Sequence, residues 1–417
     1  MTAPVTPTDP APGADTAAPR YTGEGGALFG LALRTAVLTL LTLGIYRFWA
    51  KTRIRRYIWS SVQLDGTRFE YTGTGLEKFL GFLVAVVILA IYLGLVQLLL
   101  AFLGLSLFVT PESPGAALAQ GVAFSLTGLA VLPLVFFAQY RARRYKCGRT
   151  RWRGIRFGME KAAWGYALRA LLYYGLALLT LGLLWPLATW RLSRYMIDRT
   201  WFGDARFTLG GRWTGLYPAM THILVPVALL VGGTAFAILS ERPALAAILP
   251  PVAAIWLVIG VVHYRVQSFA YLTRHTTLGG TVGFDARPRT GTVIRKYVGG
   301  SILIALAIGV VGGLLTSFFG VLFGGLMQMA EAGRPDGAAG AMAFVLPMLA
   351  ALFGYLAILL FSGAAAYALI VQPILAHYTE TLAVSDVAAL QDIRQRAADR
   401  GADAEGFADA LDLGGAI

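Results

Sequence analysis

Six long apolar runs constrain the fold of this 417-residue chain more than any other feature of its sequence. Each run has roughly the 20 residues that an α-helix needs to cross the hydrocarbon core of a bilayer. None has an Asp or Glu in its central part, and the whole chain is 57% hydrophobic and only 14% charged. The runs are approximately residues 79–104, 117–140, 217–240, 244–264, 297–327 and 342–372. They predict an all-α polytopic membrane protein with six full transmembrane helices.

Two other apolar runs, residues 27–49 and 164–188, have a different pattern. Each has about 15 apolar residues, then Thr-Leu-Gly, then a second apolar and aromatic stretch. If both crossed the membrane there would be eight spans, and short basic loops would lie on both sides, against the positive-inside bias. If each turns back at Thr-Leu-Gly, both termini and all four basic segments face the cytoplasm. Those segments are residues 51–78, 141–161, 189–215 and 264–296. We therefore expect two re-entrant helical segments, buried among the spans because irregular backbone needs cover inside a membrane.

The segment from residue 42 to residue 71 interleaves basic and aromatic side chains before a turn signal. This mixture is typical of a helix that leaves a bilayer through an anionic headgroup layer. Asp65-Gly66 then suits the two-residue type I′ turn of a β-hairpin. Similar segments recur around residues 141–157, 179–207 and 263–284. The recurrence predicts an internal duplication and small cytoplasmic β-hairpins.

These motifs resemble one known family. The run T-L-G-I-Y-R-F-W-A-K-T-R-I-R-R-Y, the following D-G-T-R-F and the later T-L-G-L-L-W-P-L-A-T-W-R-L-S-R-Y are similar to the YjgN family of bacterial inner-membrane proteins. The resemblance covers roughly Tyr21 to the C-terminus. It implies a multi-span protein of the inner membrane and brings no reaction, ligand or catalytic residue with it.

The spans and the changes in composition divide the chain into five parts. Residues 1–20, rich in Pro, Ala and Thr, are expected to be a disordered tail. Residues 21–162 form membrane unit one (re-entrant element, basic hairpin, two spans), residues 163–292 repeat that order as unit two, and residues 293–379 hold a third pair of spans. Residues 380–417 form an acidic tail. A helical pattern through Val387, Leu390, Ile393 and Ala397 predicts an amphipathic helix in this tail. The helix is either solvated or clasped onto the basic hairpins by charge attraction.

Residues that carry enzyme chemistry are sparse. The single cysteine, Cys147, excludes an intramolecular disulfide and a cysteine-rich metal site. The histidines have no metal-ligand spacing, and no paired carboxylates, Walker loop or Gly-x-Ser-x-Gly motif is present. The histidines are His222, His263, His275 and His377. We therefore expect no enzyme, no catalytic residue, no cofactor and no bound metal, and no nucleic-acid partner because no recognisable binding module is present.

Two arginines lie inside the expected re-entrant segments, where an ionisable group is costly and usually functional. Arg34 precedes Thr42, and Arg169 precedes Thr180. In one interpretation each lies in a wet cavity and receives an anionic solute, with further hydrogen bonds from nearby polar side chains. In the other, each is shallow and its head reaches the cytoplasmic headgroups. The predicted ligand-binding set is Arg34, Thr39, Thr42, Arg169, Tyr173 and Thr180.

A second set of arginines lies in the basic segments that follow apolar runs. Such arginines fix topology and bind phospholipid phosphates, or they hold a specific phosphorylated ligand. The predicted lipid-binding set is Arg53, Arg55, Arg56, Arg141, Arg143, Arg144, Arg191 and Arg194.

Two classes of function are compatible with these patterns. The first is a transporter-like or channel-like protein for a small or anionic solute, with the re-entrant elements lining a central path. The alternative is a non-transport envelope protein that binds anionic lipid or organises a partner through its cytoplasmic hairpins. The expected partners are anionic phospholipids and a small solute, and no oligomeric state follows from the sequence. A polar cavity at mid-membrane would favour the first class, and a dry packed core the second.

Overall fold

The computed structural model describes residues 16–108, 110, 113–332 and 338–396. Within these ranges six helical segments are long and apolar enough to cross a membrane. They are Gly75–Phe102 (helix α3), Pro114–Arg149 (α4), Trp213–Leu239, Pro243–Arg274 (α9), Thr290–Gly325 and Met348–Glu380. Each coincides with one of the six apolar runs, so the prediction of a polytopic membrane protein with six spans is confirmed.

Three of these segments contain more than one helical element. Residues 213–239 comprise the 3-10 turn η1 (Trp213–Leu216), α7 (Tyr217–Ala228), the π-turn η2 (Leu229–Gly233) and α8 (Thr234–Leu239). The fifth belongs to α10 (Thr290–Ala332). The sixth runs from α11 (Ala338–Ala366) through the π-turn η3 (Tyr367–Val371) into α12 (Gln372–Glu380).

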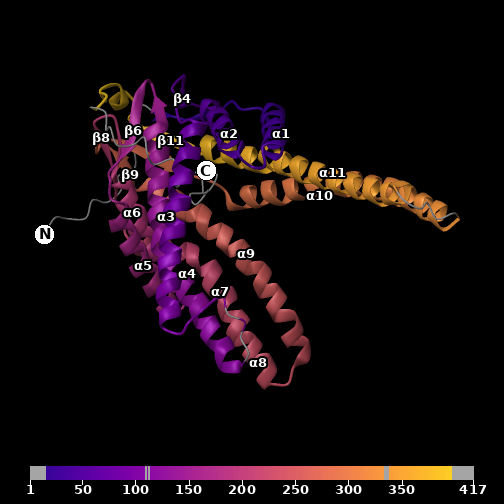
Figure 1. The fold of residues 1–417 in the computed structure, drawn as a ribbon. Helices are drawn as coiled ribbons and strands as arrows, with labels where there is room; N and C mark the ends of the chain where they lie inside the picture. The colour runs from indigo at the N-terminus through magenta and orange to yellow at the C-terminus, as the bar shows by residue number, and fades with distance from the viewer. Residues whose placement is uncertain (1–15, 109, 111–112, 333–337, 397–417) are drawn as a thin grey trace.

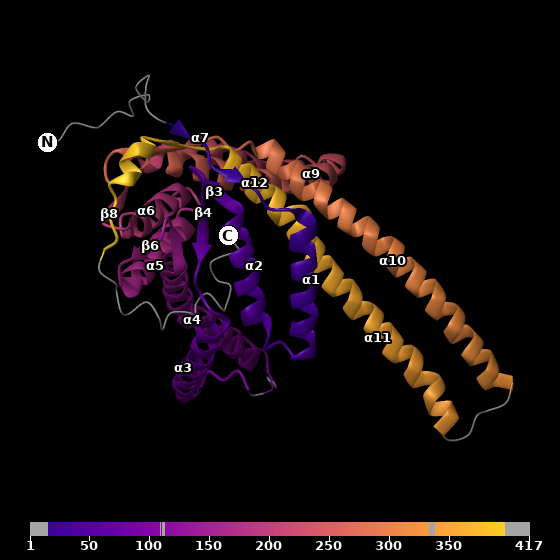
Figure 2. The ribbon, with the colours of Figure 1, turned by 90° about the horizontal axis from the view of Figure 1, so that it is seen from above.

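The spans form three antiparallel pairs, which diverge from a common root. The pairs are α3 with α4, α7–α8 with α9, and α10 with α11 (Figures 1 and 2). In the most apolar stretch of each span, at most 11% of the residues are buried. The described spans therefore do not share one central core, and their apolar faces are available to lipid or to another protein.

The two remaining apolar runs fold as short helical hairpins. The first consists of α1 (Gly25–Leu41) and α2 (Arg47–Ser61), and the second of α5 (Ala163–Leu179) and α6 (Trp185–Ile197). At the first turn Leu43 and Gly44 have φ of 50° and 91°, and at the second Leu181 and Gly182 have φ of 52° and 88°. The prediction that both runs turn back at Thr-Leu-Gly is confirmed.

The tips of these hairpins are exposed, so the expectation that they are buried among the spans is wrong. Leu43 is 95% exposed and Leu181 is 92% exposed. The reason lies in the turn, which satisfies its own polar groups. The Thr42 hydroxyl donates to a carbonyl of the preceding helical turn and accepts from the Tyr46 N–H, and Gly44 N–H closes back onto α1. Thr180 makes the same two bonds in the second hairpin. The turn therefore holds its shape through its own hydrogen bonds and does not depend on contacts with the spans.

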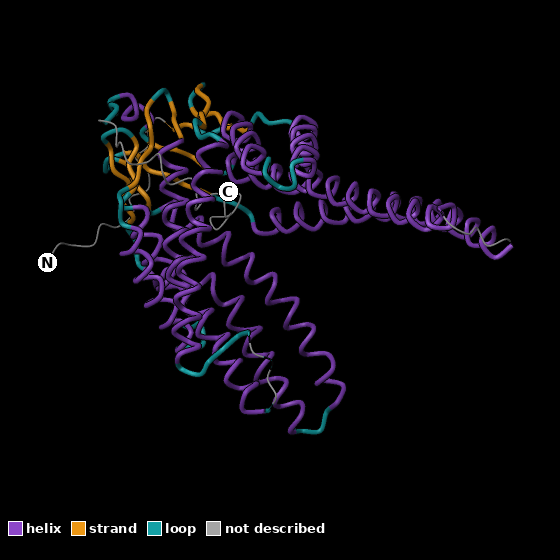
Figure 3. Tube along the Cα trace, viewed as in Figure 1, coloured by secondary structure: helices purple, strands orange, loops and turns teal. Residues whose placement is uncertain are grey.

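Within the described part of the chain, eleven short strands form one antiparallel sheet at the root of the helices (Figure 3). The strands are β1 (Thr16–Ala17), β2 (Arg20–Tyr21), β3 (Val62–Leu64), β4 (Thr67–Tyr71), β5 (Thr150–Trp152), β6 (Ile155–Met159), β7 (Thr200–Phe202), β8 (Ala205–Leu209), β9 (Thr276–Leu278), β10 (Val282–Ala286) and β11 (Leu382–Ser385). Their order is β1-β11-β10-β9-β8-β7-β6-β5-β4-β3-β2. The expected all-α fold with small β-hairpins is therefore corrected to a fold in which the hairpins join into one sheet. An isolated hairpin is marginally stable, and its free edges pair with neighbours.

The sheet curls back on itself. Strands β1 and β2 lie at its opposite edges, yet only Ala18 and Pro19 separate them in the chain. Three residue steps span at most about 10 Å, so the two edges come close together. The inside is filled by one large side chain from the first strand of each hairpin, namely Leu64, Trp152, Phe202 and Leu278. The prediction of a disordered tail is thereby wrong for residues 16–20, and residues 1–15 lie outside the described chain.

The C-terminal segment closes the curled sheet from its inside. Val387 and Leu390, in the 3-10 turn η4 (Val387–Gln391), are buried in the same core. Beyond them, Arg394 N–H donates to Asp204 and the Gln395 amide oxygen accepts from a strand N–H. The expected amphipathic helix is thus a strand and one 3-10 turn as far as residue 396, and Ala397 lies outside the described residues. This part of the tail does contact the hairpins, but it does so through apolar burial and not through the charge attraction that was expected.

All four basic hairpins belong to this one sheet, together with both described ends of the chain. The four basic segments therefore lie at the same end of the spans, as the re-entrant interpretation requires. The α1–α2 hairpin packs against α11 through Leu28, Ile54 and Ala364. The α5–α6 hairpin packs against α4 through Tyr140, Tyr166 and Leu192. Each helical hairpin thus fastens one pair of spans to the sheet.

Candidate functional site

Arginines gather where the helices meet the sheet. Arg53, Arg56, Arg191 and Arg194, on α2 and α6, are exposed. The Arg53 guanidinium lies 5.5 Å from the ring centroid of Tyr46, and those of Arg191 and Arg194 lie 5.4 and 5.1 Å from that of Trp190. Arg194 also donates from Nε to the Asp198 carboxylate at 3.2 Å, so only part of its guanidinium is available to an oxyanion. These four predicted lipid-binding residues therefore lie on the helices next to the sheet, and their binding of lipid stays a prediction.

The other four predicted lipid-binding arginines are less accessible. Arg141 and Arg143 are half-buried on α4. Arg55 is 5% exposed and donates to the Tyr71 hydroxyl, and Arg144 is 3% exposed and donates from Nε to the Met159 carbonyl at 2.8 Å. Arg55 and Arg144 thus tie their helices to strands β4 and β6 in place of meeting a phosphate.

The predicted solute-binding residues divide between α1 and α5. Arg34 is exposed, and Arg169 is exposed and lies 4.8 Å from the ring centroid of Tyr195. The Thr39 hydroxyl donates to its own helix, while Thr42 and Thr180 use their hydroxyls in the two turns. Tyr173 is half-buried beside the cluster that fastens α5 to α4.

The structure does not bring the two halves of this set together. Helix α1 lies beside α11, whereas α5 lies beside α4 on the far side of α2 (Figures 1 and 2). One anionic solute therefore cannot contact Arg34 and Arg169 at the same time within a single chain. Each arginine separately remains a predicted anion contact.

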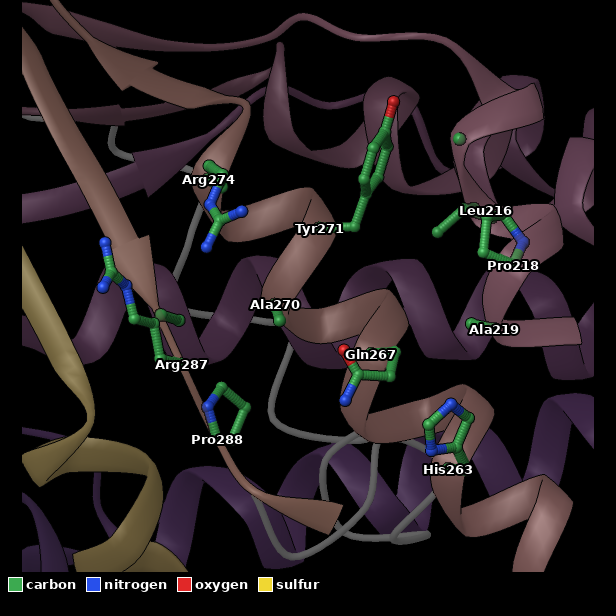
Figure 4. A pocket seen from close by; sticks show the side chains of 12 residues that line it. Leu216, Pro218, Ala219, His263, Gln267, Ala270, Tyr271, Arg274, Arg287 and Pro288 are labelled. Atoms are coloured by element: carbon green, nitrogen blue, oxygen red, sulfur yellow. The ribbon is translucent and has the colours of Figure 1, made fainter. Parts of the chain in front are cut away.

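Sequence reasoning missed a polar pocket between η1–α7, the last turns of α9 and the connection from β10 to α10. It has a volume of about 560 Å³. Figure 4 shows Arg274 and Arg287 at one end of the pocket and His263 at the opposite end. Gln267 lies between the two ends. The remaining wall is Gly215, Leu216, Pro218, Ala219, Ala270, Tyr271, Ala286 and Pro288.

Asp285, at the edge of this pocket, holds both arginines. Its two carboxylate oxygens accept from Arg274 Nε at 3.0 Å and from Arg287 Nε at 2.7 Å. Partial burial raises the pKa of the Asp285 carboxyl, but the two arginine hydrogen bonds and charges outweigh this and hold the pKa below its ordinary value of 3.8. The group is ionised at neutral pH, and the three charges sum to one positive charge.

The polar side chains of the pocket are mainly hydrogen-bond donors. Among the described residues, no group of three or more His, Cys, Asp or Glu could hold a metal ion. In the pocket the polar atoms are guanidinium, imidazole, amide and phenol groups. Such donors suit an anion. The sequence signal for the site is Asp285-x-Arg287, with Asp285 in β10 and Arg287 directly after its end.

The fold and these sites define a class: a multi-pass membrane protein with a curled sheet at one end and an arginine-rich junction between sheet and spans. The chain belongs to the family of bacterial proteins of unknown function DUF898, whose family model matches residues 16–312. The relatives place it in the bacterial inner membrane. The resemblance to the YjgN family noted from the motifs is confirmed.

Two similar proteins bear the name inner membrane protein YjgN. That of Salmonella typhimurium strain LT2 is 30% identical over 149 residues, which are 35% of this chain and 33% of that protein. That of Escherichia coli O157:H7 is 27% identical over 149 residues, 34% of this chain and 32% of that protein. Each match spans about a third of the curated relative. No solved structure matches the chain at a significant level.

Proposed function

We propose that this protein is a non-transport component of the inner membrane that binds anionic phospholipid of the cytoplasmic leaflet at the junction between its helices and its curled sheet. The observation that carries the proposal is the set of exposed arginines on α2 and α6, two of which share the Trp190 ring. Their bidentate edges match phosphate oxygens, and a basic surface at this level attracts anionic lipid.

The arrangement of the spans supports lipid binding over solute transport. The three pairs diverge, and most of their apolar surface is exposed, so lipid tails have access between them (Figure 1). Arg34 and Arg169, the two arginines that a central path would need, belong to hairpins that lie apart. The positive-inside bias assigns the sheet, with its basic hairpins, to the cytoplasmic side.

Lipid that remains bound after purification in mild detergent tests the proposal. Removing Arg53 and Arg191 together (both to Gln) should weaken retention of phosphatidylglycerol roughly 30-fold, since each cation near the surface is worth about 1 kcal/mol. A matched control is Arg68→Gln with Arg206→Gln, which removes the same charge from exposed positions on β4 and β8. The control should keep its lipid, and native mass spectrometry counts the lipids on each protein.

A further pair of variants separates a diffuse lipid layer from a geometric site. Arg56→Lys with Arg194→Lys keeps the charge but removes the fork. We expect this variant to keep most of its lipid, because at a surface the charge dominates. Equal lipid loss from the junction variant and the control would refute the proposal. So would Arg34-dependent and Arg169-dependent uptake of an anionic solute into proteoliposomes.

A further inference from the structure

We infer that the pocket between η1–α7, the end of α9 and the β10–α10 connection is a one-to-one binding site for a phosphate ester, either a lipid headgroup or a soluble one. The inference deepens the proposed function, because it names a defined site for the chemistry that the junction arginines attract in a diffuse way. Four features of the pocket support it: the charge of the arginine end, the two walls fixed by hydrogen bonds, the polar groups at the other end, and the position of the pocket next to a span.

The charge comes from two guanidinium groups that share one carboxylate. Asp285 contacts both through Nε, and the Arg274 and Arg287 side chains are 53% and 77% exposed, so a solute can reach them. Through these contacts the carboxylate keeps the two guanidinium groups close to each other. The net positive charge of this trio attracts a phosphate group, whose oxygen pairs match the guanidinium edge.

One wall of the pocket is the Tyr271 side chain, which is held by contacts with the backbone of Arg212 and Gly215. Its hydroxyl accepts from the Arg212 N–H at 3.0 Å and donates to the Arg212 carbonyl at 2.8 Å. The ring packs so closely on Gly215 that a Cβ there would collide with it. Two hydrogen bonds and one close contact therefore hold the ring in place. A wall fixed in this way lowers the cost of ordering the site when a ligand binds.

The opposite wall is also fixed by hydrogen bonds. The Arg287 N–H donates to the Thr381 carbonyl, and the Arg289 N–H donates to His377 Nε2 at 3.0 Å. These two bonds fasten the β10–α10 connection to α12. The pocket therefore has its shape before a ligand enters.

The end of the pocket away from the arginines is neutral and polar. Thr290 Oγ1 lies 3.2 Å from His263 Nδ1 and accepts from the Gln267 amide at 3.4 Å. These groups can bind the hydroxyls of a polar alcohol esterified to the phosphate. The volume of about 560 Å³ exceeds what a bare phosphate fills and lies within the range of small-molecule sites.

The position of the pocket agrees with this ligand. Helix α9 is a candidate span, and it ends at Arg274. The charged end of the pocket thus lies at the end of this candidate span, and the His263 end lies further back along the span, towards the membrane. A headgroup can enter with its phosphate on the arginines, and a soluble phosphate ester can reach the same atoms from water.

The test measures stoichiometric binding to the full chain in detergent by isothermal titration calorimetry. The two probes are glycerol 3-phosphate and dihexanoyl phosphatidylglycerol. We expect one molecule of at least one probe to bind per chain. The Arg274→Gln, Arg287→Gln variant should bind that probe more weakly by roughly tenfold or more, since two charge-assisted hydrogen bonds are lost. The Arg68→Gln, Arg206→Gln control, with equal charge loss, should bind like the unchanged protein.

A second variant keeps the inference testable if the arginine variant misfolds. Ala270→Phe puts a ring into the pocket without changing either arginine, and it should weaken binding to a similar degree. Binding of glycerol 3-phosphate as tight as that of the lipid assigns the site to soluble esters, and binding of the lipid alone assigns it to headgroups.

Three results would overturn the inference: no saturable binding of either probe, equal affinity in the pocket variants and the control, or tighter binding of citrate than of either phosphate ester. These outcomes are independent of the proposed function, which is decided by the lipid count of the Arg53 and Arg191 variant. If the Arg53 and Arg191 variant loses lipid but neither probe binds one-to-one in the calorimeter, the junction proposal stands and only the pocket inference is refuted.

Discussion

The two Thr-Leu-Gly turns predict that replacing Gly by Ala lowers the stability of the protein in the turns but raises it within the spans. Gly44 and Gly182 have φ of 91° and 88°, and an added Cβ at either would meet nothing within 4 Å. Replacement by Ala there tests backbone conformation alone. An L-residue in left-handed backbone costs about 1–2 kcal/mol. The turns are far apart, so the double variant should lose about 2–4 kcal/mol of stability.

Gly94 and Gly128 are the matched controls. They lie within α3 and α4, and an added Cβ there would also meet nothing within 4 Å. Because helical Gly is less favourable than Ala by roughly 0.5–1 kcal/mol, the same replacement should raise stability at both. The packing environment is equally empty in the two pairs, and only the backbone conformation differs.

Thermal unfolding in nanodiscs, followed by tryptophan fluorescence, measures the difference. The Gly44→Ala, Gly182→Ala protein should unfold at a lower temperature than the unchanged protein, and the Gly94→Ala, Gly128→Ala protein at the same or a higher temperature. If the two double variants shifted in the same direction by similar amounts, residues 42–46 and 180–184 would be ordinary helix and the helical hairpins would be refuted.

Two further predictions concern the sheet. Leu390→Ala should lower the free energy of unfolding by about 2–5 kcal/mol, because Leu390 is 5% exposed within the core of the curled sheet. Gln391→Ala, at the neighbouring exposed position, should have little effect in the same melting assay. Stability should also depend on pH through Asp285, whose folded pKa is below 3.8: its contribution is present above that ordinary value and is lost as pH falls through the lower folded pKa. Acid titration of the melting temperature should therefore show a smaller loss below about pH 4 in Asp285→Asn than in the unchanged protein.

The features that could be predicted from the sequence are those encoded by local patterns. An apolar run of sufficient length specifies a span wherever the rest of the chain goes, which is why all six were placed. Asp65-Gly66 has φ of 46° and 73°, as a type I′ turn requires, because the turn depends on those two residues alone. Thr-Leu-Gly likewise carries its own hydrogen bonds and its own left-handed positions.

The joining of hairpins into a sheet could not be predicted, because it depends on pairing between distant strands. Phe69 opposes Trp152, and Phe207 opposes Leu278, across hairpins that are separated by whole spans. Val387 and Leu390 lie three positions apart, which suits one face of a helix, but the pair also fits a 3-10 turn that packs inside a curled sheet. The local pattern does not distinguish these two outcomes.

The candidate sites show the same division. Arg55 and Arg56 are neighbours, yet only the first is buried, because successive residues on a helix point about 100° apart and α2 has aromatic side chains around much of its circumference. The pocket around Arg274 and Arg287 arises when the β9–β10 hairpin brings Asp285 back to the end of α9. Asp285 and Arg287 are close in the sequence, but nothing in the spacing shows that Arg274 lies next to them.

The central claim is that all four basic hairpins lie on the cytoplasmic side, in one sheet. Single cysteines at Asp65 and, separately, Asp204, in a Cys147→Ser background, test it most directly, because both are exposed hairpin-turn residues that eight full spans would place on opposite sides of the membrane. Ser113, at the far end of α3 and α4, serves as the outside reference. An impermeant maleimide is applied to whole cells with a permeabilised outer membrane. We expect Ser113→Cys to be labelled while Asp65→Cys and Asp204→Cys react only after lysis, and labelling of Asp204→Cys in intact cells would contradict the account.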